Sequence, residues 1–183
     1  MGCEVTAAMI KVVVVNGYPN SGKTTFENTC KLILGPFCQT RSTVDKVKGL
    51  ALRAGWDGRK TPEARKMLSD LKDLFTKFND MPFRDIALHI KYFEHELGQY
   101  GVESEKAVFF IDSREPEEIT RFKKELGALT LLIQRPGIAT EQSNHSDANV
   151  ENFEYDYIIN NDGTMDDLKT KAEDFLNLIF EEK

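Results

Sequence analysis

One short segment constrains the fold of this chain more than any other feature of its sequence. Residues 17–24 read Gly-Tyr-Pro-Asn-Ser-Gly-Lys-Thr and match the pattern G-x-x-x-x-G-K-[ST] at every fixed position. The apolar, β-branched run at 10–15 precedes the segment, and Phe26, Cys30 and Ile33 follow it at helical spacing. This order predicts a buried strand of a parallel sheet, then a phosphate-binding loop, then a helix.

The residue types of this loop fit the chemistry of a bound polyphosphate. Gly17 and Gly22 let the backbone turn sharply and bring N–H groups against phosphate oxygens, and the following helix points its positive dipole end at the same anion. We expect Lys23 to reach the β- and γ-phosphates and the Thr24 hydroxyl to bind Mg²⁺, so ATP and Mg²⁺ are the predicted cofactors. The alternative is a glycine-rich turn without a ligand. The residues predicted to contact the ATP phosphates are Gly17, Tyr18, Pro19, Asn20, Ser21, Gly22, Lys23, Thr24 and Thr25.

The rest of the chain predicts alternating strands and helices around one long helical stretch. This pattern indicates an α/β protein with the three-layer P-loop NTPase fold, in which a five-stranded parallel sheet carries helices on both faces. We expect a single domain over 1–183, with a helical insertion at 42–98 after the second strand and a short lid-like loop at 135–152. The remaining strands are expected at 37–41, 107–112, 129–133 and 157–159, and helices at 115–126 and after Thr164.

Polar residues mark where several of these helices begin. Ser42 or Thr43 is expected to cap the first helix of the insertion, and Thr61 is expected to cap the second because Pro62 and an acid follow it. Thr164 is expected to cap the last helix, whose first turn carries two aspartates.

Composition excludes several classes of partner. The chain has 183 residues with 24 basic and 30 acidic side chains, a net charge of −6, which disfavours a dedicated nucleic-acid binder. No apolar run approaches the roughly 20 residues that span a bilayer, so we expect no membrane partner. Cys3, Cys30 and Cys38 form no even framework, which indicates reduced thiols in a cytoplasmic protein. The sequence leaves the oligomeric state open, a homodimer included.

Charge is distributed unevenly along the chain. Residues 41–77 hold ten basic and five acidic side chains, whereas residues 141–183 hold three basic and twelve acidic ones. The cationic insertion is either a site for an anionic small molecule or a solvated helix face.

A second motif lies at the end of the third predicted strand. Phe109-Phe110-Ile111-Asp112 is a hydrophobic run ending in an acid, which suits a Walker B strand with Asp112 holding Mg²⁺ directly or through water. A switch-type GTPase should carry D-x-x-G and N-K-x-D. The candidate places, 112–115 and 160–163, read Asp-Ser-Arg-Glu and Asn-Asn-Asp-Gly, so both motifs are missing.

Together these motifs resemble the nucleoside monophosphate kinase family of P-loop kinases, in particular its deoxynucleoside monophosphate kinases and adenylate-kinase-like members from bacteria and phages. Besides the loop itself, four segments carry the resemblance. They are Ser42–Lys48, Ile111–Ile119, His145–Asp147 and Tyr155–Thr164.

The resemblance implies ATP-dependent phosphoryl transfer to a nucleoside or deoxynucleoside monophosphate, with 42–98 as the acceptor-binding insertion. It also implies that the loop before the last helix contacts the nucleotide base through the backbone of Asn161 and Gly163. Phosphoryl transfer asks a protein mainly for position and positive charge, so Lys23, Arg114 and Arg135 are the candidate catalytic residues. Guanidinium groups bind phosphate bidentately. The acceptor-binding candidates are Arg41, Ser42, Thr43, Arg59 and Arg65, with Arg114 a further candidate for the acceptor phosphate.

The sequence departs from this family in two places. The adenylate kinase form D-G-x-P-R is missing after the third strand, and the 135–152 loop offers only Arg135 and His145 as cations, where a typical lid brings several arginines. Two alternatives therefore stay open. The chain is a P-loop kinase of another small metabolite, such as a phosphorylated coenzyme precursor or a sugar acid, or a nucleotide-binding regulatory module with little turnover.

Overall fold

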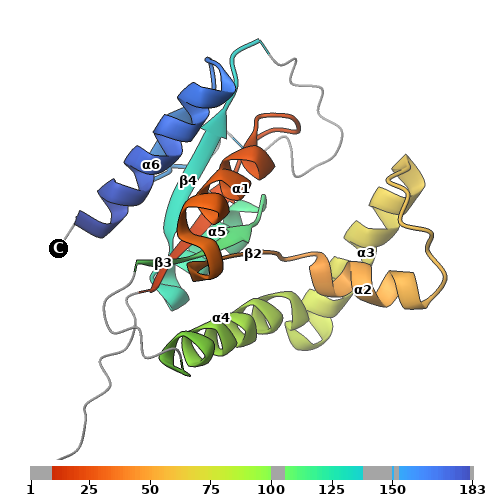
Figure 1. The fold of residues 1–183 in the computed structure, drawn as a ribbon. Helices are drawn as coiled ribbons and strands as arrows, with labels where there is room; N and C mark the ends of the chain where they lie inside the picture. Colours follow the sequence, from red (N-terminus) through yellow and green to blue (C-terminus); the bar gives the residue numbers. More distant parts are fainter. Residues whose placement is uncertain (1–9, 100–105, 138–149, 151–152, 182–183) are drawn as a thin grey trace, which may run out of the picture.

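The computed structural model describes residues 10–99, 106–137, 150 and 153–181 of the chain, and shows one five-stranded parallel sheet with helices on both faces (Figure 1). The predicted α/β class and parallel sheet are confirmed. The strands are β1 (Ile10–Asn16), β2 (Cys38–Ser42), β3 (Ala107–Asp112), β4 (Leu129–Gln134) and β5 (Tyr157–Asn160), in the order β2-β3-β1-β4-β5. The helices are α1 (Lys23–Leu34), a 3-10 turn (Gly35–Phe37), α2 (Asp45–Arg53), α3 (Pro62–Asn79), α4 (Met81–Gln99), α5 (Pro116–Leu126) and α6 (Met165–Glu181).

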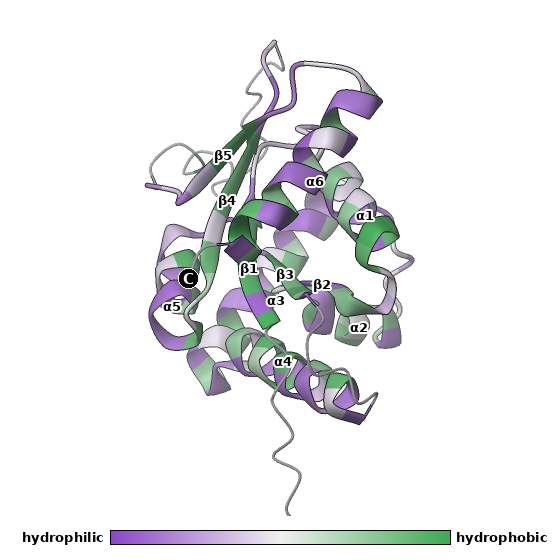
Figure 2. Ribbon diagram, turned by 60° about the vertical axis from the view of Figure 1, so that its left-hand side comes forward, coloured by the Kyte–Doolittle hydropathy of each residue, from purple (hydrophilic) through white to green (hydrophobic). Residues whose placement is uncertain are grey.

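Two apolar clusters hold the layers together, one on each face of the sheet. Val13 and Val15 of β1 point to the face covered by α1 and α6, where they pack with Phe26, whereas Val14 points to the face covered by α4 and α5. Side chains alternate between the faces of a strand, so a β1 that is apolar throughout fits burial on both sides. Figure 2 shows the central strands as mostly hydrophobic and the outer helix faces as hydrophilic.

The strand order fixes where a ligand can bind. β1 lies between β3 and β4, and the chain leaves β1 toward one side of the sheet to form β2 and toward the other after β3. In open α/β sheets a ligand binds outside the carboxyl ends of the strands at such a switch point. Val15 and Ser42 are both paired with Asp112, so the ends of β1, β2 and β3 lie at one edge.

The predicted insertion contains three helices with different roles. α4 buries Ile86, Ile90 and Phe93 against the sheet, so it belongs to a core layer rather than to a peripheral flap. In contrast, α2 and α3 stand out to one side of the layers in Figure 1. None of the described helices is long and apolar enough to cross a membrane.

The helix caps were predicted correctly at two of three places. The Thr61 hydroxyl accepts a hydrogen bond from the Ala64 N–H at 3.2 Å, and the Thr164 hydroxyl accepts one from the Asp167 N–H. The prediction of Ser42 or Thr43 for α2 is wrong, because its N-cap is Val44, without a side-chain cap. The Thr43 N–H instead continues the pairing of β2 with β3 by donating to the Asp112 carbonyl. The Ser42 N–H donates to the Asp45 carboxylate.

Buried thiols account for the cysteines that the structure describes. Cys30 on α1 and Cys38 on β2 are both free and lie in the same apolar cluster. Burial raises the pKa of both thiols, that of Cys38 to about 12, which favours inert, protonated side chains. The predicted reduced state holds for these two residues, and Cys3 lies outside the described residues.

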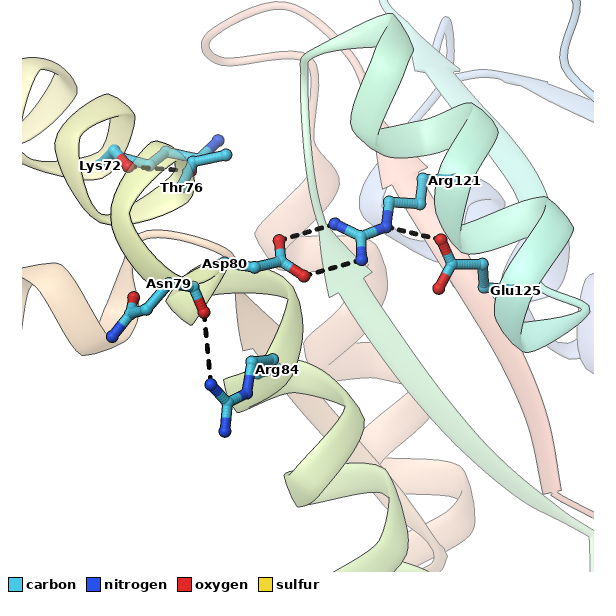
Figure 3. Close-up of polar contacts among 7 residues, drawn as sticks. All are labelled: Lys72, Thr76, Asn79, Asp80, Arg84, Arg121 and Glu125. Carbon is cyan, nitrogen blue, oxygen red and sulfur yellow. Dashed lines mark hydrogen bonds and ion pairs between the residues drawn. The ribbon is translucent and has the colours of Figure 1, made fainter.

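Two polar anchors fasten α3 to α5. The Lys72 ammonium pairs with the Glu118 carboxylate at 2.8 Å, and Glu118 also accepts from the Ser113 hydroxyl. At the left-handed residue between α3 and α4, the Asp80 carboxylate accepts two hydrogen bonds from the Arg121 guanidinium, at 2.6 and 2.7 Å (Figure 3). Arg121 also pairs with Glu125 of its own helix, so its guanidinium serves ion pairs.

The Arg121 anchor gives a first prediction. Arg121→Ala removes the bidentate pair with Asp80 and the guanidinium that lies 3.7 Å from the centroid of the Phe83 ring. We expect a loss of about 1–2 kcal/mol in the free energy of unfolding, measured by urea denaturation. A partly exposed ion pair contributes little to this stability, and the contact of the guanidinium with the Phe83 ring contributes the remainder. Lys124→Ala on the same helix is the control and should change little. Equal stability of the two variants would show that the junction carries no such anchor.

Candidate nucleotide-binding site

The loop between β1 and α1 is shaped by two close backbone approaches. Gly17 has φ of 149°, and a Cβ there would overlap the Ile133 carbonyl oxygen of β4. Gly22 has φ of 102°, and a Cβ there would overlap the Asn161 side-chain amide. Both positions therefore require glycine, for conformation as well as for space. The loop is clamped between the carboxyl ends of β4 and β5.

A buried asparagine holds the start of the loop. Asn16, the last residue of β1, is fully buried; its Oδ1 accepts from the Gly17 N–H at 2.7 Å, and its Nδ2 donates to the Tyr155 hydroxyl oxygen at 2.7 Å. Tyr155 in turn donates to the Val150 carbonyl, and burial raises its pKa to about 12, so it stays a donor. Sequence reasoning missed both residues; the available signal was a polar residue directly after an apolar strand.

The loop lysine lies inside the turn. Helix α1 begins at Lys23, whose ammonium donates to the carbonyl oxygens of Gly17 at 2.6 Å and Tyr18 at 3.3 Å. These bonds fold the side chain back over the loop. A phosphate oxygen is a stronger acceptor for an ammonium than a carbonyl is, so an incoming anion can replace these partners.

One pocket of about 590 Å³ gathers much of the predicted site. Six of the nine predicted loop residues line it, whereas Gly17, Tyr18 and Pro19 do not. Its lining residues are Asn20, Ser21, Gly22, Lys23, Thr24, Thr25, Arg135, Asn161, Gly163, Thr164, Met165 and Leu168.

Residues after β4 and β5 close this pocket from the other side. The side-chain amide of Asn161 donates to the Ser21 carbonyl at 2.9 Å, and its backbone N–H donates to the Gln134 carbonyl at 2.6 Å. Asn161 therefore braces the loop as well as lining the pocket. Gly163 packs closely on Asp167, whose carboxylate accepts from the Thr164 N–H. The predicted contact of this segment with a base stays a prediction.

Two buried side-chain atoms among the described residues lack a hydrogen-bond partner, and both lie in or beside the loop. One is Ser21 Oγ, which faces Gly17, and the other is Glu27 Oε1, one turn after Lys23 on α1. A buried polar atom without a partner is costly, and such atoms gather where a ligand completes the bonding. Their position fits a loop built around a polar ligand.

A buried charge cluster lies behind the loop. Burial raises the pKa of the Asp112 carboxyl, and the positive charges of Lys23 and Arg114 oppose this shift. Burial also raises the pKa of Glu27 to about 8, with the negative charge of Asp112 adding to the effect and Lys23 opposing it. Glu27 was missed from the sequence. The signal was an acid next to Phe26 in a helix whose spacing predicts a buried face.

This cluster predicts a dependence of stability on pH. Glu27 binds its proton more tightly in the folded chain than in the unfolded one, so the folding contribution of that proton is present below about pH 4.5 and lost as the pH rises to about 8. Glu27→Gln removes the ionisable group. The stability of this variant relative to the unsubstituted protein should therefore increase as the pH rises from about 4.5 to about 8. Thermal melts across this range measure the difference, and parallel curves for the two proteins would contradict it.

The predicted acceptor residues lie apart from the pocket lining. Ser42 and Thr43 stand at the end of β2 beside Asp112, and Arg114 follows β3 at the same edge. Arg41 is exposed on β2, Arg65 is exposed on α3, and Arg59 pairs with Asp57 in an exposed loop. The structure thus brings Ser42, Thr43 and Arg114 together, whereas Arg41 lies on β2, Arg59 in the loop between α2 and α3, and Arg65 on α3.

Many basic side chains of the cationic insertion, residues 41–77, form ion pairs with carboxylates. At least five of its ten basic side chains pair with a carboxylate: Lys46, Lys48, Arg59, Lys66 and Lys72. Trp56 donates its indole N–H to the Arg59 carbonyl, which ties the loop between α2 and α3 to itself. These ion pairs leave fewer cations for an anionic ligand, and the choice between the two interpretations of this segment stays a prediction.

The residues fit a magnesium ion of the kind that a bound nucleotide completes. No group of three or more His, Cys, Asp or Glu side chains that could hold a metal exists among the described residues. Mg²⁺ in nucleotide sites uses only one or two protein oxygens together with phosphates and waters, and prefers hard oxygen donors. The Thr24 hydroxyl and the Asp112 carboxylate, with the unpartnered Glu27 oxygen nearby, meet that requirement.

Comparison with known proteins finds likeness in overall shape only. No protein-family model and no curated protein matches this chain. A dephospho-CoA kinase from Campylobacter jejuni aligns over 93% of this chain and 97% of its own, at 14% identity and a TM-score of 0.49. The protein TT1252 from Thermus thermophilus aligns over 92% of this chain and 97% of its own, at 14% identity and a TM-score of 0.42. Likeness at this level identifies no activity, and the α/β fold rests on the strand order itself.

Proposed function

We propose that this chain is a nucleotide kinase that transfers a phosphoryl group from ATP to a nucleoside or deoxynucleoside monophosphate. The observation that carries the proposal is the Lys23 ammonium folded into a glycine-shaped loop at the switch point of the sheet, beside a pocket and the half-buried Asp112. A phosphate loop, a pocket and a carboxylate close together are the three parts that a polyphosphate, its base and its metal ion require, which supports the proposal.

On the donor side, the chain provides backbone N–H groups and one mobile cation. Residues 20–25 offer the start of α1 to the phosphates, and Lys23 exchanges its carbonyl partners for phosphate oxygens. Arg135 lines the same pocket from the end of β4 and supplies positive charge to the transferring group. Mg²⁺, held by Thr24 and Asp112, supplies charge neutralisation between the donor phosphates when bound.

On the acceptor side, Arg114 is the candidate that the geometry favours. It lies two residues after Asp112, at the edge of the sheet where Ser42 also ends β2, and its charge already acts on Asp112. A monophosphate acceptor is ionised at neutral pH, so transfer needs no general base. We propose that α2 and α3 form the flap that brings this acceptor to the donor and excludes water.

A panel of acceptors tests the proposal. Purified protein with ATP and Mg²⁺ is offered nucleoside monophosphates, deoxynucleoside monophosphates, phosphorylated coenzyme precursors and sugar acids, and ADP release is measured. We expect turnover with at least one monophosphate. Turnover of a non-nucleotide alone would replace the proposed acceptor class, and tight ATP binding without any transfer would favour the regulatory module. Arg135 is the one arginine among the described pocket residues, which keeps that module as the second candidate.

Arg114 gives a prediction specific to the acceptor. Arg114→Ala should raise the acceptor KM or lower kcat by roughly 10- to 100-fold, because a charged hydrogen bond to phosphate contributes about 1.5–3 kcal/mol. ATP affinity, measured by calorimetry, should change little. Arg53→Ala on the exposed end of α2 is the control for loss of general positive charge. Loss of ATP binding in Arg114→Ala would show that the donor and acceptor roles are assigned wrongly.

A further inference from the structure

Helix α3 carries a line of apolar side chains that its own chain does not cover. Met67, Leu71, Leu74 and Phe78 follow one another at spacings of four, three and four residues, so they form a single line along the helix, here named the α3 stripe. Leu74 is 58% exposed and Phe78 is 77% exposed, whereas Leu71 is half-buried. None of the 18 residues of α3 is fully buried.

Such a helix is unusual in an isolated subunit. Helices in proteins owe most of their stability to a buried apolar face, and 18 residues extend over about 27 Å. The half-buried side of α3 packs on α2 and α4, and the stripe lies at the border of that side. Figure 1 shows α3 to one side of the sheet layers, to which the Lys72–Glu118 pair ties it. The stripe is therefore open to another protein surface.

The charges beside the stripe favour a second copy of this helix. Glu63, Asp70 and Lys77 follow at intervals of seven residues along one border of the stripe, so the N-terminal half of the border is acidic and the C-terminal half is basic. Lys77 has no ion-pair partner within the described part of the chain. Asp70 pairs with Lys66 of its own helix at 2.7 Å, and both side chains are exposed. Two such helices in antiparallel orientation bring Lys77 of each copy to that pair on the other, against Asp70, with Leu71 facing Leu74 and Met67 facing Phe78.

We propose that the α3 stripe is the contact surface of a two-fold symmetric homodimer, in which the α3 helices of two copies pack antiparallel. A two-fold contact is self-complementary, which a line of apolar residues with opposite charges at its two ends provides. One helix pair covers less than a stable standard interface of about 1,600 Å², so the dimer should be in equilibrium with monomer. This inference is independent of the proposed kinase activity.

Sedimentation equilibrium of the full chain over a wide range of concentrations tests the interface. We expect a monomer–dimer equilibrium that Phe78→Glu shifts to monomer, raising the dimer dissociation constant by at least about tenfold. Leu32→Glu is the matched control, because Leu32 is 86% exposed on α1, away from the stripe, and should leave the equilibrium unchanged. Circular dichroism shows that each variant is folded.

A charge exchange tests the antiparallel orientation. Asp70→Lys and Lys77→Asp should each weaken the dimer, and the double variant should restore it, since the two charges then meet again in reversed order. A chain that is monomeric at all concentrations, or a dimer that Phe78→Glu leaves intact, overturns the proposed surface. A dimer that Phe78→Glu breaks but the double variant does not restore overturns the antiparallel pairing.

Discussion

Lys23→Ala is expected to lower kcat/KM for phosphoryl transfer by roughly 10²–10³-fold, the typical effect of removing one preorganised group that stabilises developing charge. The Lys23 ammonium donates to the Gly17 and Tyr18 carbonyl oxygens, and phosphate oxygens are better acceptors than either. The loss should therefore appear in both ATP affinity and kcat, measured by calorimetry and by steady-state kinetics. Stability should fall by only about 1 kcal/mol, since the two hydrogen bonds lost are partly exposed.

Lys31→Ala is the matched control for this change. Lys31 lies two turns further along α1 and is exposed. The substitution therefore removes the same charge from the same helix without changing a loop residue. Its ATP affinity and turnover should equal those of the unsubstituted protein. Transfer at a normal rate in Lys23→Ala would place the phosphate site elsewhere in the molecule, whatever the outcome of the acceptor panel.

The layers of the fold could be predicted because their signals are local. The apolar run before the loop, the spacing of Phe26, Cys30 and Ile33, and the Thr61-Pro62 start of α3 each depend on neighbouring residues alone. Strand positions agreed with the structure to within one residue, and the sheet followed from the alternation of strands with helices.

The support of the site was harder to predict because its partners are distant in sequence. Asn16 and Tyr155 are 139 residues apart, and Asn161 and Ser21 are 140 apart, yet both pairs hold the loop in place. The predicted cap at Thr43 was wrong for the same reason, because the Thr43 N–H donates to the Asp112 carbonyl and continues the strand, a contact that exists only once β3 lies beside β2. In the sequence Glu27 resembles a surface acid; its burial, and its closeness to the charges of Asp112 and Lys23, arise only in the folded chain.

Arg135 is the first residue of the predicted lid. Arg135 lines the pocket, and its catalytic role stays a prediction; the predicted lid over 135–152 lies largely outside the described residues, His145 included. The cations that the structure does place near Asp112, namely Lys23, Arg114 and Lys48, come from three different elements. A site with few lid arginines can thus obtain positive charge from α1, from α2 and from the segment after β3, which is what the proposed phosphoryl transfer requires.

Gly17→Ala should be the most destabilising single change in the loop. Its φ of 149° lies where L-residues are strained, and the added methyl group would overlap the Ile133 carbonyl oxygen and lie 2.8 Å from Ser21 Oγ. Ile133 and the Asn16 side chain that accepts from the Gly17 N–H are both fully buried, so neither can move away from the added methyl group without a large cost in packing. We expect a loss of about 3 kcal/mol in the free energy of unfolding, which for a domain of this size lowers Tm by about 6–12 °C.

Gly49→Ala separates this effect from a general cost of replacing glycine. Gly49 lies inside α2, has no positive φ, and a Cβ there meets nothing within 4 Å. The change should therefore stabilise the chain by about 0.5–1 kcal/mol, because alanine loses less conformational entropy in a helix. Opposite signs for the two variants in thermal melts are the expected result. A Gly17→Ala protein that melts with the unsubstituted one would mean that the loop is not clamped against β4, and the nucleotide pocket built on that contact would then have to be abandoned.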